Sequence, residues 1–172
     1  MEEPKFKGII QMAYIVSDLE KEMEHWVKDL GVGPWFTSDH FAGQDRMYRG
    51  KPTDVDLKIG MSYAGQMNIE LIQQINDAPS PFRETAEKRG YGFHHFCIHS
   101  DNFDEDFKRY SAQGYDLVFT VNMRGARIAY FDNPGLPGMI ELVSFPATVQ
   151  QMFLTWFRAA QNWDGSNPYR KR

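Results

Sequence analysis

The sequence lacks most features that would tie it to disulfide bonds, membranes or nucleic acids. It contains a single cysteine, Cys97, in 172 residues, which excludes an intramolecular disulfide bond and is typical of a reducing compartment. No apolar run approaches the ~20 residues that cross a bilayer, and the charged N-terminus does not resemble a secretory signal. The net charge is only −4, and basic residues are scattered except for Arg170-Lys171-Arg172. We therefore expect a soluble, cytoplasmic protein that binds neither nucleic acid nor membranes, with a solvated basic end.

Aromatic residues are what the sequence has in excess. The 13 Phe, 8 Tyr and 4 Trp exceed what a domain of 172 residues needs in order to fold, so some of them are expected to line a pocket or an interface. Six residues are candidate substrate contacts, although each is also compatible with ordinary core packing: His99, Phe36, Met61, Met123, Tyr130 and Trp156.

The most informative pattern is an internal repeat. The run Gln11–Leu19 is echoed by His95–Phe103, and Met67–Ile72 is echoed by Gly138–Val143. Each pair consists of a strand-like run at the same place in its half of the chain. If the halves pack about a pseudo-twofold axis, the polar residues at matching places converge on one point. Those four residues are Gln11, Glu70, His95 and Glu141.

Hydrophobic periodicity predicts a strand followed by a helix at the start of each half. Residues 9–16 alternate, with Gln11, Ala13 and Ile15 on one face, and a helical stripe then runs to Gly31. Ser17 and Glu20 have the spacing of a capping box for that helix. In the second half, Phe93, His95, Cys97 and His99 alternate on one strand face, and a helical stripe from Phe103 ends at Gly114. The polar candidates therefore face away from the helices, into a concavity.

The remaining segments complete a single-domain organisation. We expect module one at about 7–78, a linking helix at about 80–89, module two at about 91–145, and a C-terminal helix and tail at 146–172. Residues 37–56 are interpreted as a long loop or an irregular strand. The bulky stripe of the final helix is expected to pack on the domain's own sheet or on a partner subunit, and a lid over the pocket is the alternative.

Several motifs resemble the vicinal oxygen chelate superfamily, which includes glyoxalase I, methylmalonyl-CoA epimerase, extradiol dioxygenases and bleomycin-resistance proteins. The motifs are Gln11-x-Ala13-x-x-Val16-x-Asp18-Leu19, Leu30-Gly31-Val32-Gly33-Pro34-Trp35, Gly92-Phe93-His94-His95 and Gly138-Met139-Ile140-Glu141-Leu142. The resemblance spans roughly residues 7–144. It implies an α+β fold in which two tandem βαβββ modules form a cupped mixed sheet around one divalent metal ion. It also implies a homodimer.

The ligand set and the motifs point to different branches of that superfamily. The order Gln, Glu, His, Glu resembles glyoxalase I, whose metal ligands would map onto Gln11, Glu70, His95 and Glu141. Epimerases of the family usually have His at the first position, yet Gly33-Pro34-Trp35 and the run 130–138 look more like the epimerase branch. The extradiol dioxygenases need two histidines and one carboxylate around iron, which weighs against them because position 11 is glutamine.

The donor chemistry predicts a metal-dependent lyase or isomerase. Three oxygen donors and one imidazole suit Zn, Ni, Co, Mn or Fe and leave positions for a substrate oxygen. A proton next to a metal-bound carbonyl or hydroxyl can then be removed through an enolate-like intermediate, with Glu141 as the first choice of base and Glu70 as ligand and second candidate base. A metal-free binding protein of the bleomycin-resistance kind and an iron-dependent dioxygenase are the alternative functions.

Two further points stay open from the sequence alone. His94 would replace His95 as the ligand if the strand slipped by one residue, and otherwise His94 is interpreted as a surface or outer hydrogen-bonding residue. A glutathione or CoA thioester substrate would call for a basic patch near the mouth of the cup, for which Arg46, Arg49 and Lys51 are the candidates, and a solvated run of charges is the equal alternative for this loop. The aromatic excess favours an aromatic small-molecule substrate instead.

Overall fold

The computed structural model describes residues 2–172 and contains, in that range, one mixed sheet and four helices. The first half comprises β1 (Gly8–Ile15), α1 (Leu19–Leu30), β2 (Trp35–Ser38), β3 (Gln44–Tyr48), β4 (Lys51–Pro52), β5 (Leu57–Ala64) and β6 (Met67–Gln74). After α2 (Pro81–Arg89), the second half comprises β7 (Gly92–His99), α3 (Phe103–Ala112), β8 (Asp116–Met123), β9 (Ala126–Asp132) and β10 (Met139–Ser144). The chain closes with α4 (Ala147–Gln161) and β11 (Tyr169–Lys171). None of the helices in residues 2–172 is both long and apolar enough to cross a membrane.

The two halves meet at the centre of the sheet. The strand order is β11-β2-β5-β6-β1-β7-β10-β9-β8-β3-β4. β1 pairs in parallel with β6 and antiparallel with β7, and β7 pairs in parallel with β10. The first and last strands of each half are therefore the four innermost strands. This curved mixed sheet confirms the expected α+β fold.

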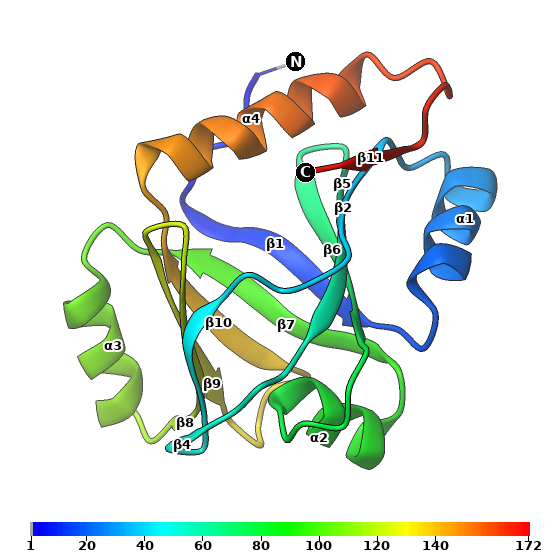
Figure 1. Ribbon diagram of the computed structural model, residues 1–172. Coiled ribbons are helices and arrows are strands. Elements are labelled where there is room, and N and C mark those ends of the chain that lie inside the picture. The colour runs from blue at the N-terminus through cyan, green and yellow to red at the C-terminus, as the bar shows by residue number, and fades with distance from the viewer. Residues whose placement is uncertain (1) are drawn as a thin grey trace.

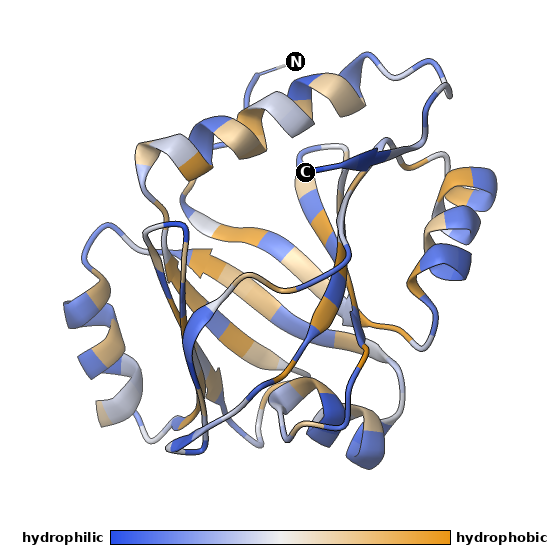
Figure 2. Cartoon of the chain, viewed as in Figure 1, coloured by the Kyte–Doolittle hydropathy of each residue, from blue (hydrophilic) through white to orange (hydrophobic). Residues whose placement is uncertain are grey.

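The helices α1 and α3 cover the outer side of the sheet (Figure 1), whereas Phe82 of α2 and Val149 and Phe153 of α4 line the inside of the cup. Leu19 and Met23 of α1 pack with Trp35 and Leu71 in one outer cluster. Phe103 and Tyr110 of α3 pack with Phe131 and Leu142 in the equivalent cluster of the second half. Figure 2 shows the outward faces of both helices as largely hydrophilic. The predicted helical stripes thus bury against the strand faces opposite the polar candidates.

The start of α1 differs from the expected capping box. Asp18, one residue after Ser17, has extended backbone and its side chain accepts a hydrogen bond from the Lys21 N–H at 3.0 Å. Glu20 instead forms an ion pair with Lys58 of β5 at 2.7 Å. An aspartate caps a helix at least as well as serine, so either residue satisfies the free N–H groups of the first turn. The helix ends at Gly31 as expected, with φ +67°.

Two segments expected to be irregular join the sheet. Within residues 37–56, β3 pairs antiparallel with β8 of the second half, so this stretch is partly strand. Beyond residue 162, where the sequence analysis expects a tail with a solvated basic end, β11 pairs in parallel with β2. The backbone N–H of Arg172 donates to the Thr37 carbonyl oxygen at 3.0 Å. The C-terminal segment is therefore part of the fold.

The final helix packs on its own chain. In Figure 1, α4 lies across one rim of the cup, above β1 and β5. The Phe157 ring meets the Tyr63 ring edge-on, with centroids 5.4 Å apart, while Val149 and Phe153 face the inside of the cup. The helix therefore both completes the core and forms one wall of the interior.

Candidate functional site

The four repeated polar residues come together at the centre of the sheet. Gln11 lies on β1, Glu70 on β6, His95 on β7 and Glu141 on β10, and none is more than 6% exposed. The Nε2 atom of His95 is 3.6 Å from Glu70 Oε2 and 3.3 Å from Glu141 Oε2. All four side chains belong to one chain, so this cluster does not depend on a second subunit.

The amide of Gln11 has a fixed orientation. Its Nε2 donates to Asn68 Oδ1 at 2.8 Å, and Asn68 Nδ2 in turn donates to the Ser62 carbonyl oxygen at 3.0 Å. Since the backbone carbonyl can only accept, the Asn68 amide must present its oxygen to Gln11. The carbonyl oxygen of Gln11 is then the atom available to bind a cation.

An irregularity in β7 sets the orientation of His94 and His95. The register between β1 and β7 shifts between Ala13 and Tyr14, next to His95 and Phe93. Phe93 consequently packs on Tyr14 and Phe96, with centroids 5.8 Å and 4.6 Å away, instead of sharing a face with His95. The bulge breaks the expected alternation at one residue. As a result His94 is buried rather than on the surface, and its ring stacks on Phe82.

Hydrogen bonds of His94 determine which nitrogen of His95 carries a proton. His94 Nε2 lies 3.3 Å from the Pro81 carbonyl oxygen and must donate to it. Burial and the neighbouring His95 lower the pKa of His94 to about 3, so its Nδ1 carries no proton at neutral pH. That atom is 2.8 Å from His95 Nδ1 and accepts a hydrogen bond from it. The lone pair of His95 is thereby assigned to Nε2, which faces the two carboxylates.

The two carboxylates differ in their hydrogen bonds. Glu141 Oε1 accepts from the Tyr130 hydroxyl at 2.8 Å. Burial acts to raise the pKa of Glu141, but His95, Cys97 and Tyr130 outweigh it and hold that pKa below its usual value. Burial and the charge of Glu141 raise the pKa of Glu70 to about 7. Within residues 2–172, the Glu70 carboxylate accepts no hydrogen bond.

The donors fit a divalent metal ion chemically. Within residues 2–172 the side chains as placed do not form a closed group of three or more His, Cys, Asp or Glu donors. However, His95 Nε2 is buried and has no hydrogen-bond partner in the described part of the chain. A buried polar atom without a partner is costly unless a ligand satisfies it. One imidazole nitrogen beside two carboxylates and an amide oxygen is a donor set that first-row divalent ions accept.

A cavity of about 280 Å³ opens in front of this cluster and is lined by Gln11, Glu70 and Glu141. Its walls are apolar residues at every second position of the strands, for example Leu57, Ile59 and Met61 on β5. Three of the six expected contacts, Met61, Met123 and Tyr130, line this cavity. Its volume is close to the lower end of the range of about 300–1,000 Å³ for ligand pockets. The site therefore suits a small molecule.

The other three expected contacts lie outside the cavity lining. Phe36 and Trp156 stack on each other with centroids 5.2 Å apart, behind the wall. His99 packs beside Phe6 and Phe145, with centroids 6.0 Å and 5.9 Å away. Ordinary core packing, the alternative reading for all three, explains their positions.

The basic patch expected for a thioester or glutathione does not face the cavity. Arg46 Nη1 donates to the Val55 carbonyl oxygen at 2.7 Å, and Arg49 forms an ion pair with Glu84 at 2.9 Å. Lys51 is exposed on the edge strand β4. These cations serve the structure of the β3–β4 segment.

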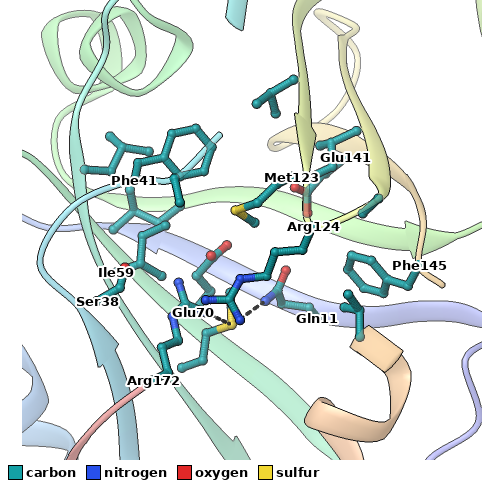
Figure 3. Close-up of a pocket in the computed structure, with 18 of the residues that line it drawn as sticks. Gln11, Ser38, Phe41, Ile59, Glu70, Met123, Arg124, Glu141, Phe145 and Arg172 are labelled. Carbon is teal, nitrogen blue, oxygen red and sulfur yellow. Dashed lines mark hydrogen bonds between the residues drawn. The ribbon is translucent and has the colours of Figure 1, made fainter. Parts of the chain in front are cut away.

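Two arginines that sequence reasoning missed reach the cavity instead. Arg124 comes from the hairpin between β8 and β9, and Arg172 follows β11. Figure 3 shows their side chains extending from opposite sides toward Glu70 and Gln11. The Arg124-Gly125 turn was readable as a hairpin, but no local signal indicates that a C-terminal arginine returns to the centre of the molecule.

Comparisons with known proteins identify the family. The model of the glyoxalase/bleomycin resistance protein/dioxygenase superfamily matches residues 10–131, which is more than half of the chain, so the protein belongs to this superfamily. No curated protein matches the sequence significantly.

Solved structures show the same fold at low identity. Methylmalonyl-CoA epimerase from Mycobacterium tuberculosis is 19% identical, with a TM-score of 0.59 over 84% of this chain and 91% of that one. A hypothetical protein from Bacillus halodurans is also 19% identical, with a TM-score of 0.58 over 81% and 94% of the two chains. A Streptomyces coelicolor methylmalonyl-CoA epimerase variant in complex with 2-nitronate-propionyl-CoA is 18% identical, with a TM-score of 0.55 over 83% and 97%. At these identities the likeness establishes the fold and leaves the reaction open.

Proposed function

We propose that this member of the superfamily is a divalent-metal-dependent lyase or isomerase of the glyoxalase and epimerase type. Its reaction removes a proton from a carbon next to a carbonyl or hydroxyl group. The observation that carries the proposal is the buried Nε2 of His95, which has no hydrogen-bond partner among residues 2–172 and faces two carboxylates at 3.3 Å and 3.6 Å.

Four residues would hold the ion: Gln11 through its amide oxygen, Glu70 and Glu141 through their carboxylates, and His95 through Nε2. An ion bound there supplies Lewis acidity, which draws charge from a substrate oxygen and makes the adjacent C–H bond more acidic. The donor set is compatible with Zn, Ni, Co, Mn and Fe.

Glu70 is the better candidate for the base, which reverses the order expected from sequence. The hydrogen bond from the Tyr130 hydroxyl holds the Glu141 carboxylate in place and favours its ionised form, which is the form that binds a cation. Within residues 2–172 Glu70 accepts no such hydrogen bond, so its carboxylate is the freer of the two to accept a proton from the substrate carbon and return it. Glu70 would take the proton from the substrate carbon. Returning it to another face or a neighbouring carbon completes an isomerisation, and departure of a β-substituent completes an elimination.

The apolar cavity walls support this chemistry by excluding water. Ile59, Phe41 and Val121 line the space in front of the carboxylates. In such surroundings a charge on the substrate interacts more strongly with the side chains that face it.

Metal binding tests the proposal first. EDTA-treated protein is titrated calorimetrically with zinc, nickel, cobalt and manganese, for wild type, His95→Ala and the control His25→Ala, whose side chain is exposed on α1. We expect one ion per chain in wild type and H25A. H95A should lose more than the ~10–100-fold in affinity that removal of an outer hydrogen-bond partner costs. Failure of all four ions to bind wild type would refute the proposal.

Proton abstraction is tested in deuterium oxide. Loaded protein is incubated with a panel of α-hydroxy ketones, α-hydroxy acids and thioesters, and deuterium incorporation is followed by NMR. Exchange that is present in wild type and the surface variant Glu20→Gln, and lost in Glu70→Gln, supports the proposed base. Oxygen consumption in place of deuterium incorporation would identify a dioxygenase.

The proposed centre is complete within one chain. A homodimer is expected from the family resemblance, but none of the four donors has to come from a partner. Size-exclusion chromatography with light scattering measures the oligomeric state, and metal stoichiometry measures the number of ions per chain, so the two properties are tested separately.

A further inference from the structure

We propose that the cavity binds a small organic anion, with an apolar or aromatic body against the walls and an oxyanion group, carboxylate or phosphate, held by Arg124 and Arg172. The proposal rests on the proposed function for the reacting end of the ligand. The two arginines are an independent observation, because neither belongs to the donor cluster.

Arg172 is positioned by the last strand of the sheet. The pairing of β11 with β2 and the bond from the Arg172 N–H to Thr37 direct its side chain toward the cup. Its Nη1 lies 3.2 Å from the sulfur of Met61, and its guanidinium lies 5.6 Å from the centre of the Trp156 ring. Within residues 2–172 its side chain makes no ion pair and no hydrogen bond to oxygen.

Arg124 occupies a backbone conformation that arginine rarely adopts. It has φ +52° and is followed by Gly125 at φ +79°, as in a two-residue hairpin turn that favours Asn-Gly. A residue other than glycine in this region costs on the order of 1 kcal/mol. Its Nη1 lies 3.6 Å from the sulfur of Met152, and it too makes no ion pair in the described part of the chain. The turn thus carries a strained cation directed at the cavity.

Thioether sulfur is a weak acceptor, so the partly buried guanidinium of Arg172 lacks a strong acceptor within residues 2–172, and the exposed guanidinium of Arg124 is open to water or to a ligand. Burial lowers the pKa of Arg172 to about 10, the charge of Glu70 opposes this lowering, and Arg124 adds to it, so the two cations are close enough to repel each other. Arg172 stays charged at neutral pH. A divalent ion would balance the charges of Glu70 and Glu141, leaving the two arginines without counter-charge. An oxyanion between them supplies that charge and the acceptor atoms that planar guanidinium groups bind best.

The other residues that line the cavity indicate the size and polarity of the apolar part of the ligand. Phe41, Ile59 and Phe145 line it beside the arginines (Figure 3). With about 280 Å³ available, the space suits an arylalkyl or branched alkyl group of modest size. The ligand class is therefore a small acid that carries an apolar group and an oxygen able to reach the donor cluster.

The test compares ligands that differ in charge. Calorimetry at constant ionic strength measures 3-phenyllactate, its neutral amide 3-phenyllactamide, and benzylphosphonate, with both zinc-loaded and EDTA-treated protein. The variants are Arg172→Gln, Arg124→Gln and the control Lys171→Gln. Lys171 carries the same charge on the same strand but pairs with Asp39 on the outer side. Any direct contribution of zinc to anion binding is common to all variants, so the change in the acid-to-amide ratio reports the arginines.

We expect wild type and K171Q to prefer an anion over the amide by at least about tenfold, as charged hydrogen bonds allow. R172Q and R124Q should each reduce that preference to less than about threefold, and Arg172→Lys should restore part of it. The tighter of phenyllactate and benzylphosphonate identifies the anion as carboxylate or phosphate.

Three results would overturn the anion site: equal affinity for acid and amide in wild type, no binding of either anion, or an equal loss in K171Q and R172Q. Circular dichroism melting of R172Q and R172K checks that both fold. If zinc does not bind but the arginine-dependent preference persists in EDTA, the proposed function fails and the anion site stands. If zinc binds and the preference is absent, the anion site alone fails.

Discussion

Glu70 and Glu141 lie on equivalent strands of the two halves, and both of their cross-strand neighbours differ: Ala13 on β1 lies beside Glu70 where Cys97 on β7 lies beside Glu141. Met61 lies opposite Glu70 on β5, and Tyr130 lies opposite Glu141 on β9. A thioether donates no hydrogen bond, whereas the Tyr130 hydroxyl donates to Glu141. The carboxylate of Glu141 is therefore held by a hydrogen bond and favoured as an anion. The carboxylate of Glu70 accepts no such hydrogen bond within residues 2–172, and its pKa is raised to about 7. A repeated fold can thus give two like residues different chemistry through their cross-strand neighbours.

The strongest test of this difference exchanges each carboxylate for its amide. We expect Glu70→Gln to lower the proton-exchange rate by about 10²–10⁴-fold at saturating zinc, the range for loss of a general base, and to weaken zinc binding less than Glu141→Gln does, because Glu141 is the carboxylate held in its anionic form. Glu141→Gln should mainly weaken zinc binding. The measurements are deuterium incorporation at saturating zinc and zinc titration. Equal losses of both properties in both variants would remove the functional distinction between the halves.

The pH dependence of stability should have opposite signs for the two carboxylates. Burial and Glu141 raise the pKa of Glu70 from 4.5 to about 7, so the folded state holds its proton where the unfolded state has lost it. As pH rises from 4.5 to 7, this group lowers the free energy of unfolding of the metal-free protein, by up to about 3 kcal/mol. Glu141, with its lowered pKa, contributes stability above pH 4.5 that is lost as the pH falls further.

Urea unfolding in EDTA across this pH range measures both effects. Glu70→Gln should flatten the decline between pH 4.5 and 7. Glu141→Gln should only reduce the decline, because burial, the larger cause of the Glu70 shift, remains. An unchanged decline in E70Q would assign it to another group.

His94 has no counterpart in the first half, where Ile10 precedes Gln11. His94→Phe keeps the stacking on Phe82 but removes the acceptor for His95 Nδ1. We expect zinc affinity to fall by about 10–100-fold. The ¹⁵N NMR signature of His95 should change from one protonated nitrogen at Nδ1 to a mixture of tautomers. His94→Asn, which retains an acceptor, should recover part of the affinity, and loss of affinity without a tautomer change would indicate a packing role only.

The smallest expected effect comes from removing the hydrogen-bond donor to Glu141, which has no equivalent beside Glu70 in the first half. Tyr130→Phe removes the donor to Glu141, and a hydrogen bond to a charged group contributes about 1.5–3 kcal/mol. The pKa of Glu141 should rise, and zinc affinity near pH 6 should fall by about tenfold, with less effect at pH 8. Tyr14→Phe, on the outer face of β1, is the matched control and should leave both unchanged. A pH-independent loss in Y130F would indicate damaged packing instead.

Local periodicity was sufficient to predict the elements that carry the donor cluster. Alternation along residues 9–16 places Gln11 and Ala13 on the inner face, as the structure has them. The glycine at position 31 ends α1 as expected. Both features depend on residues that are close together in the sequence, so they can be predicted without knowing the fold. Phe93 and His94 were placed incorrectly because a β-bulge inserts one residue into the alternation, and no residue type in that run marks it.

The repeated strand–helix pattern, and with it the matching positions of Gln11, Glu70, His95 and Glu141, can be predicted from the order of the residues alone. The hydrogen bonds that distinguish the two glutamates, the contact of His94 with His95 and the entry of Arg172 into the cavity can be recognised only once the chain is folded. Each of these depends on contacts between segments far apart in the chain, such as β2 with β11 and α2 with β7. Such pairing cannot be predicted from the hydrophobic periodicity of either segment. The hydrogen bonds come from the backbone of the partner segment and do not depend on which side chains the two segments carry.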